Sequence, residues 1–336
     1  MAKRKLSLQQ RRRIAEQRNE RKRQQHAPPS DADLGPLISG KVIANFGFQV
    51  IVKGENSEQR CHLRANLEPV TGDDVQWREG SEYGVVESID QRRSELQRPD
   101  SYGKLRSVAA NVTQLVICIA CEPEAHSSLI DRYLVAANLH KLNAVLLLNK
   151  KELLEQKTEL QAMLQRYYEL GINCIYVSAK QGFGLDKLRE ALKGQTSIFV
   201  GQSGVGKSSL IKALEPEQDI RIGALSEAAA KGKHTTTHSQ LYEFSGGGQL
   251  IDSPGIREFG LWHASAEQVL EGFPEIADAA QHCRFRDCKH QSEPGCAVHA
   301  ALDSGELQAL RYANYQLILQ QLGDVTIKTQ DGLKKR

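Results

Sequence analysis

The sequence predicts a multidomain protein: an N-terminal OB-type β-barrel, a central α/β P-loop domain and a C-terminal, mostly α-helical domain. Three observations predict it. Short alternating segments lie near the N-terminus, apolar runs alternate with helical stretches in the middle, and a compact cysteine/histidine cluster lies near the C-terminus. The predicted boundaries are 1–35 for a basic, disordered arm, 36–104 for the barrel, 105–272 for the α/β domain and 273–336 for the helical domain with its basic tail.

The composition is that of an ordinary soluble globular protein. Of the 336 residues, 40% are hydrophobic and 25% are charged. No apolar run reaches the roughly 20 residues that a membrane-spanning helix requires, and the basic N-terminus lacks the apolar core of a signal peptide. We therefore expect a cytoplasmic protein. Nothing in the sequence indicates a dimerisation helix, so a monomer is expected.

Positive charge is concentrated in the first 25 residues. They hold ten Lys or Arg and two Glu, a local charge of +8, whereas the whole chain carries only +3. The other 311 residues therefore carry a net charge of about −5. A basic arm on a nearly neutral body suggests a polyanionic partner, most often nucleic acid. The alternative is a solvated arm without a fixed partner, and the charge alone does not choose between them.

The hydrophobic pattern supports the first two folded domains in turn. Between residues 38 and 103, short segments with partial apolar alternation are separated by Gly, Asn and Asp, which predicts a small antiparallel barrel of five strands. Such barrels often bind oligonucleotides, although a fold alone does not establish a function. From 107 to 272, apolar runs alternate with helical stretches, which predicts a mostly parallel sheet covered by helices. These runs are VTQLVICIA, NAVLLLN, NCIYVSA and TSIFVG.

A phosphate-loop motif, G-x-x-x-x-G-K-[ST], lies between an apolar strand and a helix in SIFVGQSGVGKSSL, and this is the context that the motif requires. Its glycines let backbone N–H groups surround a phosphate, and the helix N-terminus favours an anion. Lys207 is expected to reach the β- and γ-phosphates, and the Ser208 hydroxyl to bind Mg²⁺. The residues predicted to bind nucleotide here are Gly201, Gln202, Ser203, Gly204, Val205, Gly206, Lys207, Ser208 and Ser209.

Two downstream segments complete the predicted phosphate site. Asp252 follows an apolar strand in LIDSPG and is expected to hold Mg²⁺ through water, while Gly255 lets its N–H approach the γ-phosphate. The polar segment KGKHTTTHS precedes them, and one of its threonines would close the Mg²⁺ shell. The sequence does not identify which threonine does so, and Thr236 is taken as the candidate.

Two further motifs indicate a guanine site. Asn149 and Lys150 end an apolar strand, in the place of the N-K-x-D loop whose carboxylate reads guanine. The S-A-K motif, which supports the base, follows the next apolar strand. Each motif is weak alone, but both stand at strand ends. The residues predicted to bind nucleotide are Asn149, Lys150, Lys151, Glu152, Ser178, Ala179 and Lys180.

The order of these motifs is informative. GTPases usually run from phosphate loop and switch to DxxG, N-K-x-D and S-A-K, but here the last two come first. With the motifs numbered in the usual order from G1 (phosphate loop) to G5 (S-A-K), this chain runs G4-G5-G1-G2-G3, which predicts a circularly permuted GTPase. Permutation leaves the site intact because ligands lie at the carboxyl ends of parallel strands, whatever the order of the chain. The fourth guanine-loop residue is Glu152 rather than Asp. The added methylene either weakens GTP affinity somewhat, which we favour, or relaxes base selectivity.

The cysteine/histidine cluster predicts a structural zinc site. Three thiolates and one imidazole fill a tetrahedral shell without an open position, and their spacing within a polar loop opposes a buried-core interpretation. The predicted ligands are Cys283, Cys288, His290 and Cys296, with His282 and His299 as weaker substitutes for His290. Cys118 and Cys121 also form a CxxC, but they lie in an apolar strand, where cysteine acts as a small hydrophobe.

In this order the barrel, permuted GTPase and Cys₃His cluster resemble the ribosome small subunit-dependent GTPase A family of bacteria. The resemblance covers about residues 36–320 and rests on GQSGVGKSS, HTTTHS, DSPGIREFGLW and the cysteine spacing. It implies an OB barrel, a GTPase and a zinc-binding domain that dock on the small ribosomal subunit. It also implies ribosome-stimulated hydrolysis of GTP to GDP during late maturation of that subunit. The basic arm fits contact with rRNA, whose strength would depend on salt.

Catalysis is expected to combine positioning of the attacking water with neutralisation of the γ-phosphate charge by Lys207, by Mg²⁺ held with Asp252, and by backbone amides. Ile256 stands where Ras-like enzymes place a water-orienting Gln, and an apolar side chain cannot orient water. His234, in the HTTT motif of the resembled family, is the candidate that replaces it. The alternative is that His234 merely contacts rRNA or solvent.

Three functions compete. The first is a ribosome-assembly GTPase, and the second is an RNA-binding assembly factor in which nucleotide is mainly a structural or regulatory ligand. The third is a P-loop ATPase or kinase of another kind. The phosphate-site residues Lys207, Ser208 and Asp252 favour the first over the second, and the Asn149–Lys150 pair argues against the third.

Overall fold

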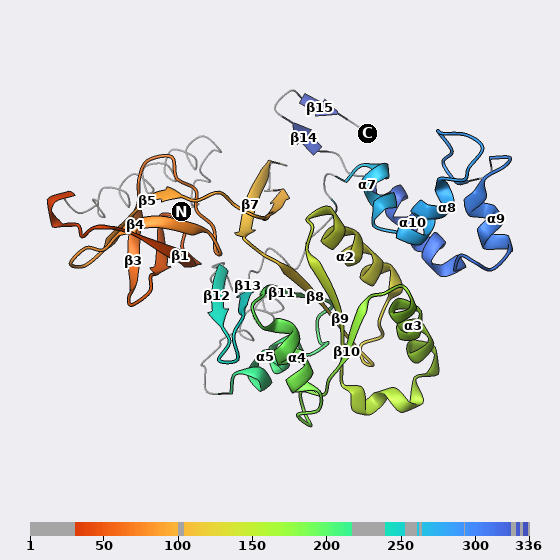
Figure 1. Cartoon of the computed structure of the whole chain (residues 1–336), viewed down its shortest axis with the longest axis horizontal. Coiled ribbons are helices and arrows are strands. Elements are labelled where there is room, and N and C mark those ends of the chain that lie inside the picture. The colour runs from red at the N-terminus through yellow and green to blue at the C-terminus, as the bar shows by residue number, and fades with distance from the viewer. Residues whose placement is uncertain are drawn as a thin grey trace, which may run out of the picture. The chain divides into compact units, whose positions relative to one another are not determined.

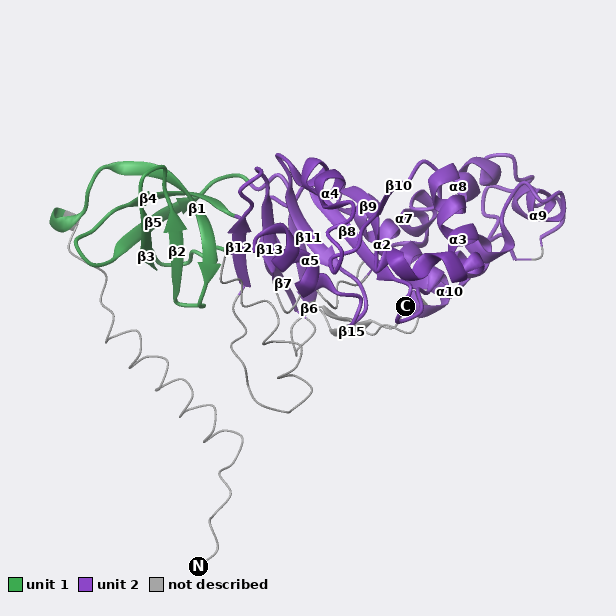
Figure 2. Cartoon of the chain, turned by 90° about the horizontal axis from the view of Figure 1, so that it is seen from below, with its two compact units in different colours: residues 1–69, 73–91 green, residues 70–72, 92–336 purple. Residues whose placement is uncertain are grey.

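The computed structural model describes residues 31–99, 104–216, 239–252, 261, 264–291, 293–323, 327–329 and 332–334. The chain forms two compact units, shown in green and purple in Figure 2. Unit 1 comprises residues 1–69 and 73–91, and unit 2 comprises residues 70–72 and 92–336. The basic arm up to residue 30 lies outside the described residues.

Unit 1 is a closed five-stranded barrel that follows a short 3₁₀ helix, η1 (Asp31–Asp33). The strand order is β1-β2-β3-β5-β4, and β4 returns to pair with β1, which closes the barrel. Alternate side chains fill its interior, where Trp77 is fully buried among valines. The predicted five-stranded barrel is confirmed, but it is not wholly antiparallel, because β3 and β5 pair in parallel. Its strands are β1 (Leu37–Asn45), β2 (Gln49–Lys53), β3 (Glu58–Leu63), β4 (Asp74–Arg78) and β5 (Gly84–Ile89).

The centre of unit 2 is a sheet in the order β10-β9-β8-β11-β13-β12. All neighbouring strands are parallel except β12, which runs antiparallel to β13. Every residue of β8 is buried, as expected for a central strand that is covered on both faces. The predicted α/β domain is confirmed. Its strands are β8 (Gln114–Ala120), β9 (Asn143–Asn149), β10 (Asn173–Tyr176), β11 (Thr196–Val200), β12 (Ser239–Glu243) and β13 (Gln249–Asp252).

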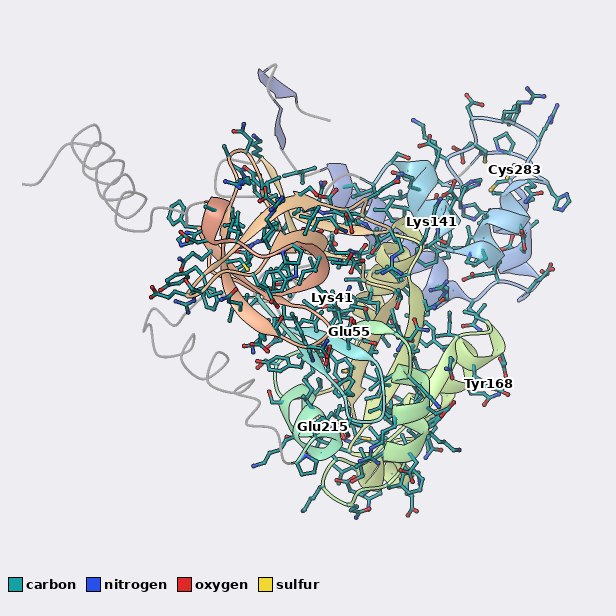
Figure 3. The ribbon with its side chains drawn as sticks, turned by 60° about the vertical axis from the view of Figure 1, so that its left-hand side comes forward. Lys41, Glu55, Lys141, Tyr168, Glu215 and Cys283 are labelled. Atoms are coloured by element: carbon teal, nitrogen blue, oxygen red, sulfur yellow. The ribbon has the colours of Figure 1, made fainter. Side chains whose placement is uncertain are left out.

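Helices cover this sheet (Figure 1). Helices α4 (Leu185–Leu192) and α5 (Lys207–Leu214) share one apolar core with strands β8 to β11. Helix α2 (Ser127–Leu139) packs against β8 and β9, and α3 (Thr158–Glu169) packs against β10 and the 3₁₀ helix η2 (Lys151–Gln156). Tyr168 of α3 is exposed at the surface (Figure 3).

A two-stranded hairpin, β6 (Glu95–Pro99) and β7 (Leu105–Ala110), belongs to unit 2 rather than to the barrel. The residue after it, Asn111, donates its side-chain N–H to the carbonyl of Gly72, at 2.9 Å. Because this hairpin is tied to unit 2, the division between the units falls after residue 91, earlier than the expected boundary at 104.

The C-terminal part of the described chain is mostly helical. Helix α10 packs against both α2 and α7, which attaches this part to the α/β sheet. Among the described helices, none is long and apolar enough to cross a membrane. The elements are α7 (Ala266–Glu271), α8 (Pro274–Ala280), α9 (Ala297–Asp303), α10 (Ala309–Gly323), β14 (Ile327–Thr329) and β15 (Gly332–Lys334).

Candidate functional site

The phosphate loop joins β11 to α5 at the carboxyl end of the sheet. Gly201 has φ +137°, and a Cβ there would lie 2.0 Å from the carbonyl oxygen of Cys118. Gly206, at φ +92°, leaves room for Asn149, whose Nδ2 would lie 2.4 Å from an added Cβ. These two positions therefore require glycine. The Lys207 ammonium folds back over the loop and donates to the carbonyls of Gly201 and Gln202, both at 2.7 Å.

A cavity of about 630 Å³ lies over this loop, and we call it the phosphate-loop cavity. Asp252, at the end of β13, reaches it from the neighbouring strand. The structure thus brings Asp252 to the loop as the motif spacing predicts. The predicted residues that line the cavity are Gly201, Gln202, Ser203, Gly204, Gly206, Lys207, Ser208, Ser209 and Asp252.

Two residues of α2, Leu129 and Tyr133, also line the phosphate-loop cavity, and the sequence motifs do not predict them. Burial raises the pKa of the Tyr133 phenol, and a hydrogen bond from the Gly201 backbone partly offsets that rise. Their spacing of four residues indicates a shared helix face. No local sequence pattern predicts which helix packs over the phosphate loop. Only the tertiary packing of α2 shows that its residues form part of the cavity lining.

The guanine motif lies directly against the phosphate loop. The Asn149 amide donates to the carbonyl of Val205 at 2.9 Å, and its oxygen accepts from the N–H of Ala179 at 3.1 Å. Lys150, in the left-handed conformation at φ +61°, donates to the carbonyl of Gly204 at 3.1 Å. The segments that the sequence places far apart, in permuted order, therefore meet at one end of the sheet.

Glu152 lies beside the S-A-K motif. A hydrogen bond from the Ser178 hydroxyl, opposed by burial and helped by the charges of Lys180 and Lys150, holds the pKa of Glu152 below its ordinary value. The Oε2 atom of Glu152 is buried without a hydrogen-bond partner among the described residues. The side chain is thus an ionised carboxylate with an oxygen left to accept.

The remaining predicted nucleotide residues differ in placement. The Val205 side chain is buried in the sheet core, so its backbone alone can face a nucleotide. Lys151 lies with its Nζ 4.8 Å from the centre of the Phe183 ring, and Lys180 is exposed. His234, Thr236 and Gly255 lie outside the described residues.

The cysteine/histidine cluster lies in the loop between α8 and α9, which we call the metal loop, residues 283–296 (Cys283 is labelled in Figure 3). The four ligand atoms of Cys283, Cys288, His290 and Cys296 lie within 4.8 Å of one another. Cys283 Sγ is 3.5 Å from His290 Nδ1 and 3.9 Å from Cys296 Sγ. These donors are close enough to hold one metal ion.

His290 is the histidine of this cluster. His299 turns its Nε2 to the His290 carbonyl, at 3.2 Å, and so supports the loop from outside the donor set. Tyr312 of α10 donates its hydroxyl to the same carbonyl. The cysteines of the CxxC motif, Cys118 and Cys121, are instead buried and free, and burial raises the pKa of both thiols.

The chain is similar to known GTPases. The model of the family described as RsgA GTPase matches residues 89–262. A relative from Saccharophagus degradans, named "Small ribosomal subunit biogenesis GTPase RsgA", is 52% identical over 343 residues that cover 98% of this chain and 100% of that relative. A protein of the same name from Ectopseudomonas mendocina is 51% identical, over 96% of this chain and 98% of the relative.

Solved structures agree with this relationship. The crystal structure of YjeQ from Thermotoga maritima has a TM-score of 0.71 and 30% identity, and the match covers 86% of this chain and all of that one. YloQ, described as a circularly permuted GTPase, has a TM-score of 0.68 and 27% identity over 88% of this chain and 98% of its own. The permuted motif order, the fold and these similarities agree, and the chain belongs to the RsgA GTPase family as a circularly permuted GTP hydrolase.

Proposed function

We propose that this protein hydrolyses GTP while bound to the small ribosomal subunit, during late maturation of that subunit. The observation that carries the proposal is the joining of the Asn149 loop to the phosphate loop in a chain whose relatives are named as GTPases of small ribosomal subunit biogenesis. Because the base-reading loop is hydrogen-bonded to the phosphate-binding loop, the two loops can respond together to the bound nucleotide.

In this proposal the nucleotide contacts are those that the motifs predict. Backbone amides of the phosphate loop and Lys207 hold the phosphates, and Glu152 accepts from the guanine ring. The hydroxyls of Ser208 and Thr236 bind Mg²⁺, with Asp252 holding the ion through water. The position of Ser208 and Asp252 on the same cavity supports this assignment.

Catalysis then depends on neutralising charge at the γ-phosphate and on orienting water. We assign the first role to Lys207 and Mg²⁺ and the second to His234, because Ile256 cannot orient water. The His234→Ala variant should bind GTP normally and lose ribosome-stimulated turnover. Unchanged stimulated turnover would remove His234 from the mechanism.

We also propose that the metal loop holds one structural zinc ion per chain. Three sulfur donors and one imidazole are the chemistry that zinc prefers, and four protein ligands leave no position open for substrate. The ion would contribute to folding of the loop rather than to hydrolysis. A metal with oxygen preference, such as Mg²⁺, does not fit this donor set.

Contact with rRNA is proposed for the positively charged parts of the chain. Beyond the basic arm, hairpin β6–β7 pairs Arg98 directly opposite Arg106. Two arginines at paired positions place positive charge on one hairpin, and arginine is a common ligand of phosphate oxygens. The protein is further proposed to act as a cytoplasmic monomer.

The experiment that tests this function compares GTP hydrolysis with and without purified small ribosomal subunits, with ATP as the control nucleotide. We expect strong stimulation that is selective for GTP. Absence of stimulation would favour an RNA-binding assembly factor in which nucleotide is mainly a regulatory ligand. Equal turnover of ATP would show that the guanine loop has been misassigned.

A further inference from the structure

Two neighbouring residues of α10 reach two different sites. Arg311 contacts α2 of the α/β sheet, whereas Tyr312 contacts the metal loop. Because one helix carries both contacts, a shift of α10 moves both together. Any coupling of the metal loop to the nucleotide site through α10 rests on the zinc assignment proposed above.

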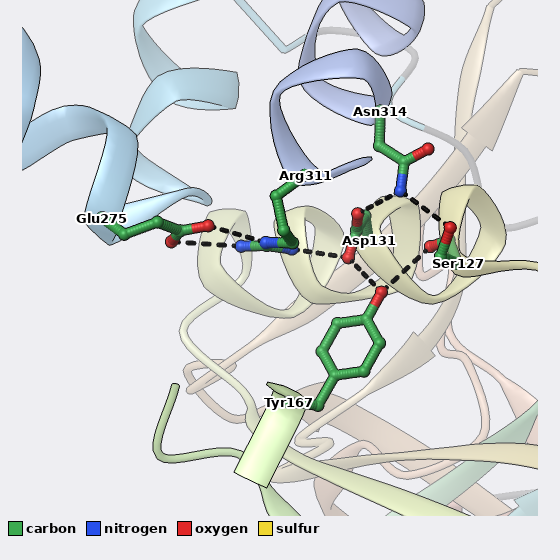
Figure 4. A network of polar contacts seen from close by, with 6 residues as sticks. All are labelled: Ser127, Asp131, Tyr167, Glu275, Arg311 and Asn314. Carbon is green, nitrogen blue, oxygen red and sulfur yellow. Dashed lines mark hydrogen bonds and ion pairs between the residues drawn. The ribbon is translucent and has the colours of Figure 1, made fainter. Parts of the chain in front are cut away.

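The contact of Arg311 with α2 is buried and lies within a network of hydrogen bonds (Figure 4). Its Nη1 lies 2.5 Å from Asp131 Oδ1, and its Nε and Nη2 lie 2.6 and 3.2 Å from the two oxygens of Glu275. Asp131 also accepts from the Tyr167 hydroxyl and from the Asn314 amide, each at 2.6 Å. Such a set of charge-assisted bonds has one well-defined geometry, so it fixes α10 against α2.

Helix α2 carries this contact to the phosphate-loop cavity. Asp131 lies between Leu129 and Tyr133 in sequence, and these two residues line the cavity from another face of the same helix. Tyr133 faces the same cavity as Gly201, the first glycine of the phosphate loop. A change in the position of α2 therefore changes a wall of the cavity.

On the other side, Tyr312 holds the backbone of a metal ligand. Its hydroxyl donates to the carbonyl of His290, and His290 has a left-handed backbone at φ +58°. A residue other than glycine in this conformation needs support from its surroundings. Tyr312 supplies that support from α10, so the geometry of the ligand loop and the position of α10 depend on each other.

We propose that Arg311 and Tyr312 are positioning residues that couple the metal loop to the nucleotide site. Metal in the loop fixes His290, His290 fixes Tyr312 and α10, and Arg311 then fixes α2 beside the phosphate loop. Ordering at one site lowers the entropy cost of ordering the other, which produces positive cooperativity between metal and nucleotide. By linkage, nucleotide must strengthen metal binding by the same factor with which metal strengthens nucleotide binding.

The test measures Zn²⁺ affinity of the full-length protein by equilibrium competition with a chromophoric chelator, with and without saturating Mg²⁺–GDP. The chelator alone with GDP corrects for binding of Zn²⁺ to the nucleotide. We expect GDP to tighten Zn²⁺ binding by about fivefold or more, the lower end of typical coupling between sites. No ribosome is present, so this result is separate from the test of ribosome stimulation.

Two variants remove the coupling at different points. Tyr312→Phe loses only the hydroxyl that holds His290, and Arg311→Lys keeps the charge but loses the paired contact with Glu275. Each variant should still bind Zn²⁺ alone and GDP alone. The ratio of Zn²⁺ affinity with GDP to Zn²⁺ affinity without GDP should fall towards one. The matched control is Tyr315→Phe, on the same helix, where Tyr315 packs against the Phe273 ring. It should keep the full effect.

Each outcome decides the proposal. Equal Zn²⁺ affinity with and without GDP in the unaltered protein would overturn the coupling and leave the zinc site intact. A GDP effect that survives in both variants would show that coupling exists but does not run through Arg311 and Tyr312. Failure of the purified protein to hold Zn²⁺ would overturn the zinc assignment and the coupling with it.

Discussion

The Asn149 amide donates to the carbonyl of Val205 at 2.9 Å, and this bond joins the guanine loop to the phosphate loop across 56 residues of chain. Both groups are buried, so loss of the bond leaves the Val205 carbonyl as a buried acceptor without its partner. Asn149→Ala should therefore weaken GDP binding by about tenfold, as measured with a fluorescent GDP analogue. The control is Asn143→Ala at the exposed start of the same strand, which should bind GDP normally. Equal affinity in both variants would contradict this role.

Lys207 is expected to carry most of the phosphate charge neutralisation. Lys207→Ala should lower the rate constant of GTP turnover on small subunits by about 100-fold or more, because a preorganised charge at the transferring phosphoryl group is lost. Lys212 lies exposed on the same helix, so Lys212→Ala should turn over GTP at the normal rate. A similar loss in both variants would show that the change acts on helix α5 rather than on the phosphate.

The ionisation of Glu152 sets the pH range of guanine selectivity. Hydrogen bonding by Ser178 keeps the pKa of Glu152 below its ordinary value of 4.5. Because its pKa is lowered, the ionised Glu152 carboxylate makes its full contribution to guanine binding at any pH above its ordinary pKa. That contribution is lost only as the pH falls through the lowered pKa. The preference for GDP over ADP should therefore stay constant from about pH 7.5 to pH 5.5, as measured by competition binding.

Glu152→Gln provides the matching variant, because it replaces an acceptor oxygen with an N–H donor that faces the donors of guanine. We expect the preference for GDP over ADP to fall by about tenfold or more at every pH in that range. Retention of the preference in Glu152→Gln would mean that another group reads the base.

The metal loop should lose its ion when a ligand is removed. Cys283→Ser should lower the zinc content measured by elemental analysis and lower the Tm. A loss of about 2 kcal/mol corresponds to roughly 4–8 °C for a domain of this size. Cys174→Ser is the control, since Cys174 lies on β10, away from the metal loop, and should keep one ion per chain. Unchanged zinc content in Cys283→Ser would exclude Cys283 as a ligand.

The buried ion pair between Arg311 and Asp131 should matter more for stability than an exposed pair. Arg311→Met leaves two carboxylates, Asp131 and Glu275, without their partner and should lower the free energy of unfolding by about 3–5 kcal/mol in urea titration. Arg189 pairs with exposed Asp186 on α4, so Arg189→Met should change stability by less than about 0.5 kcal/mol. Equal changes would contradict the assigned role of burial.

The sequence alone determined the chemistry of the sites. The phosphate loop, the guanine motif and the Cys₃His spacing are local patterns, because backbone conformation and ligand count depend on residues close together in the chain. Motif order likewise predicted the permuted topology. Val205 shows the limit of this reasoning, since it lies inside the motif but its side chain packs into the sheet core.

Only the tertiary structure decided which distant groups meet. It joined Asn149 to Val205, placed Leu129 and Tyr133 over the phosphate loop, and tied hairpin β6–β7 to unit 2. It also brought Arg311 from near the C-terminal end of the described chain to Asp131 on α2. These contacts depend on how helices pack on the sheet, and packing is set by the fit of many non-local apolar surfaces at once rather than by any local pattern.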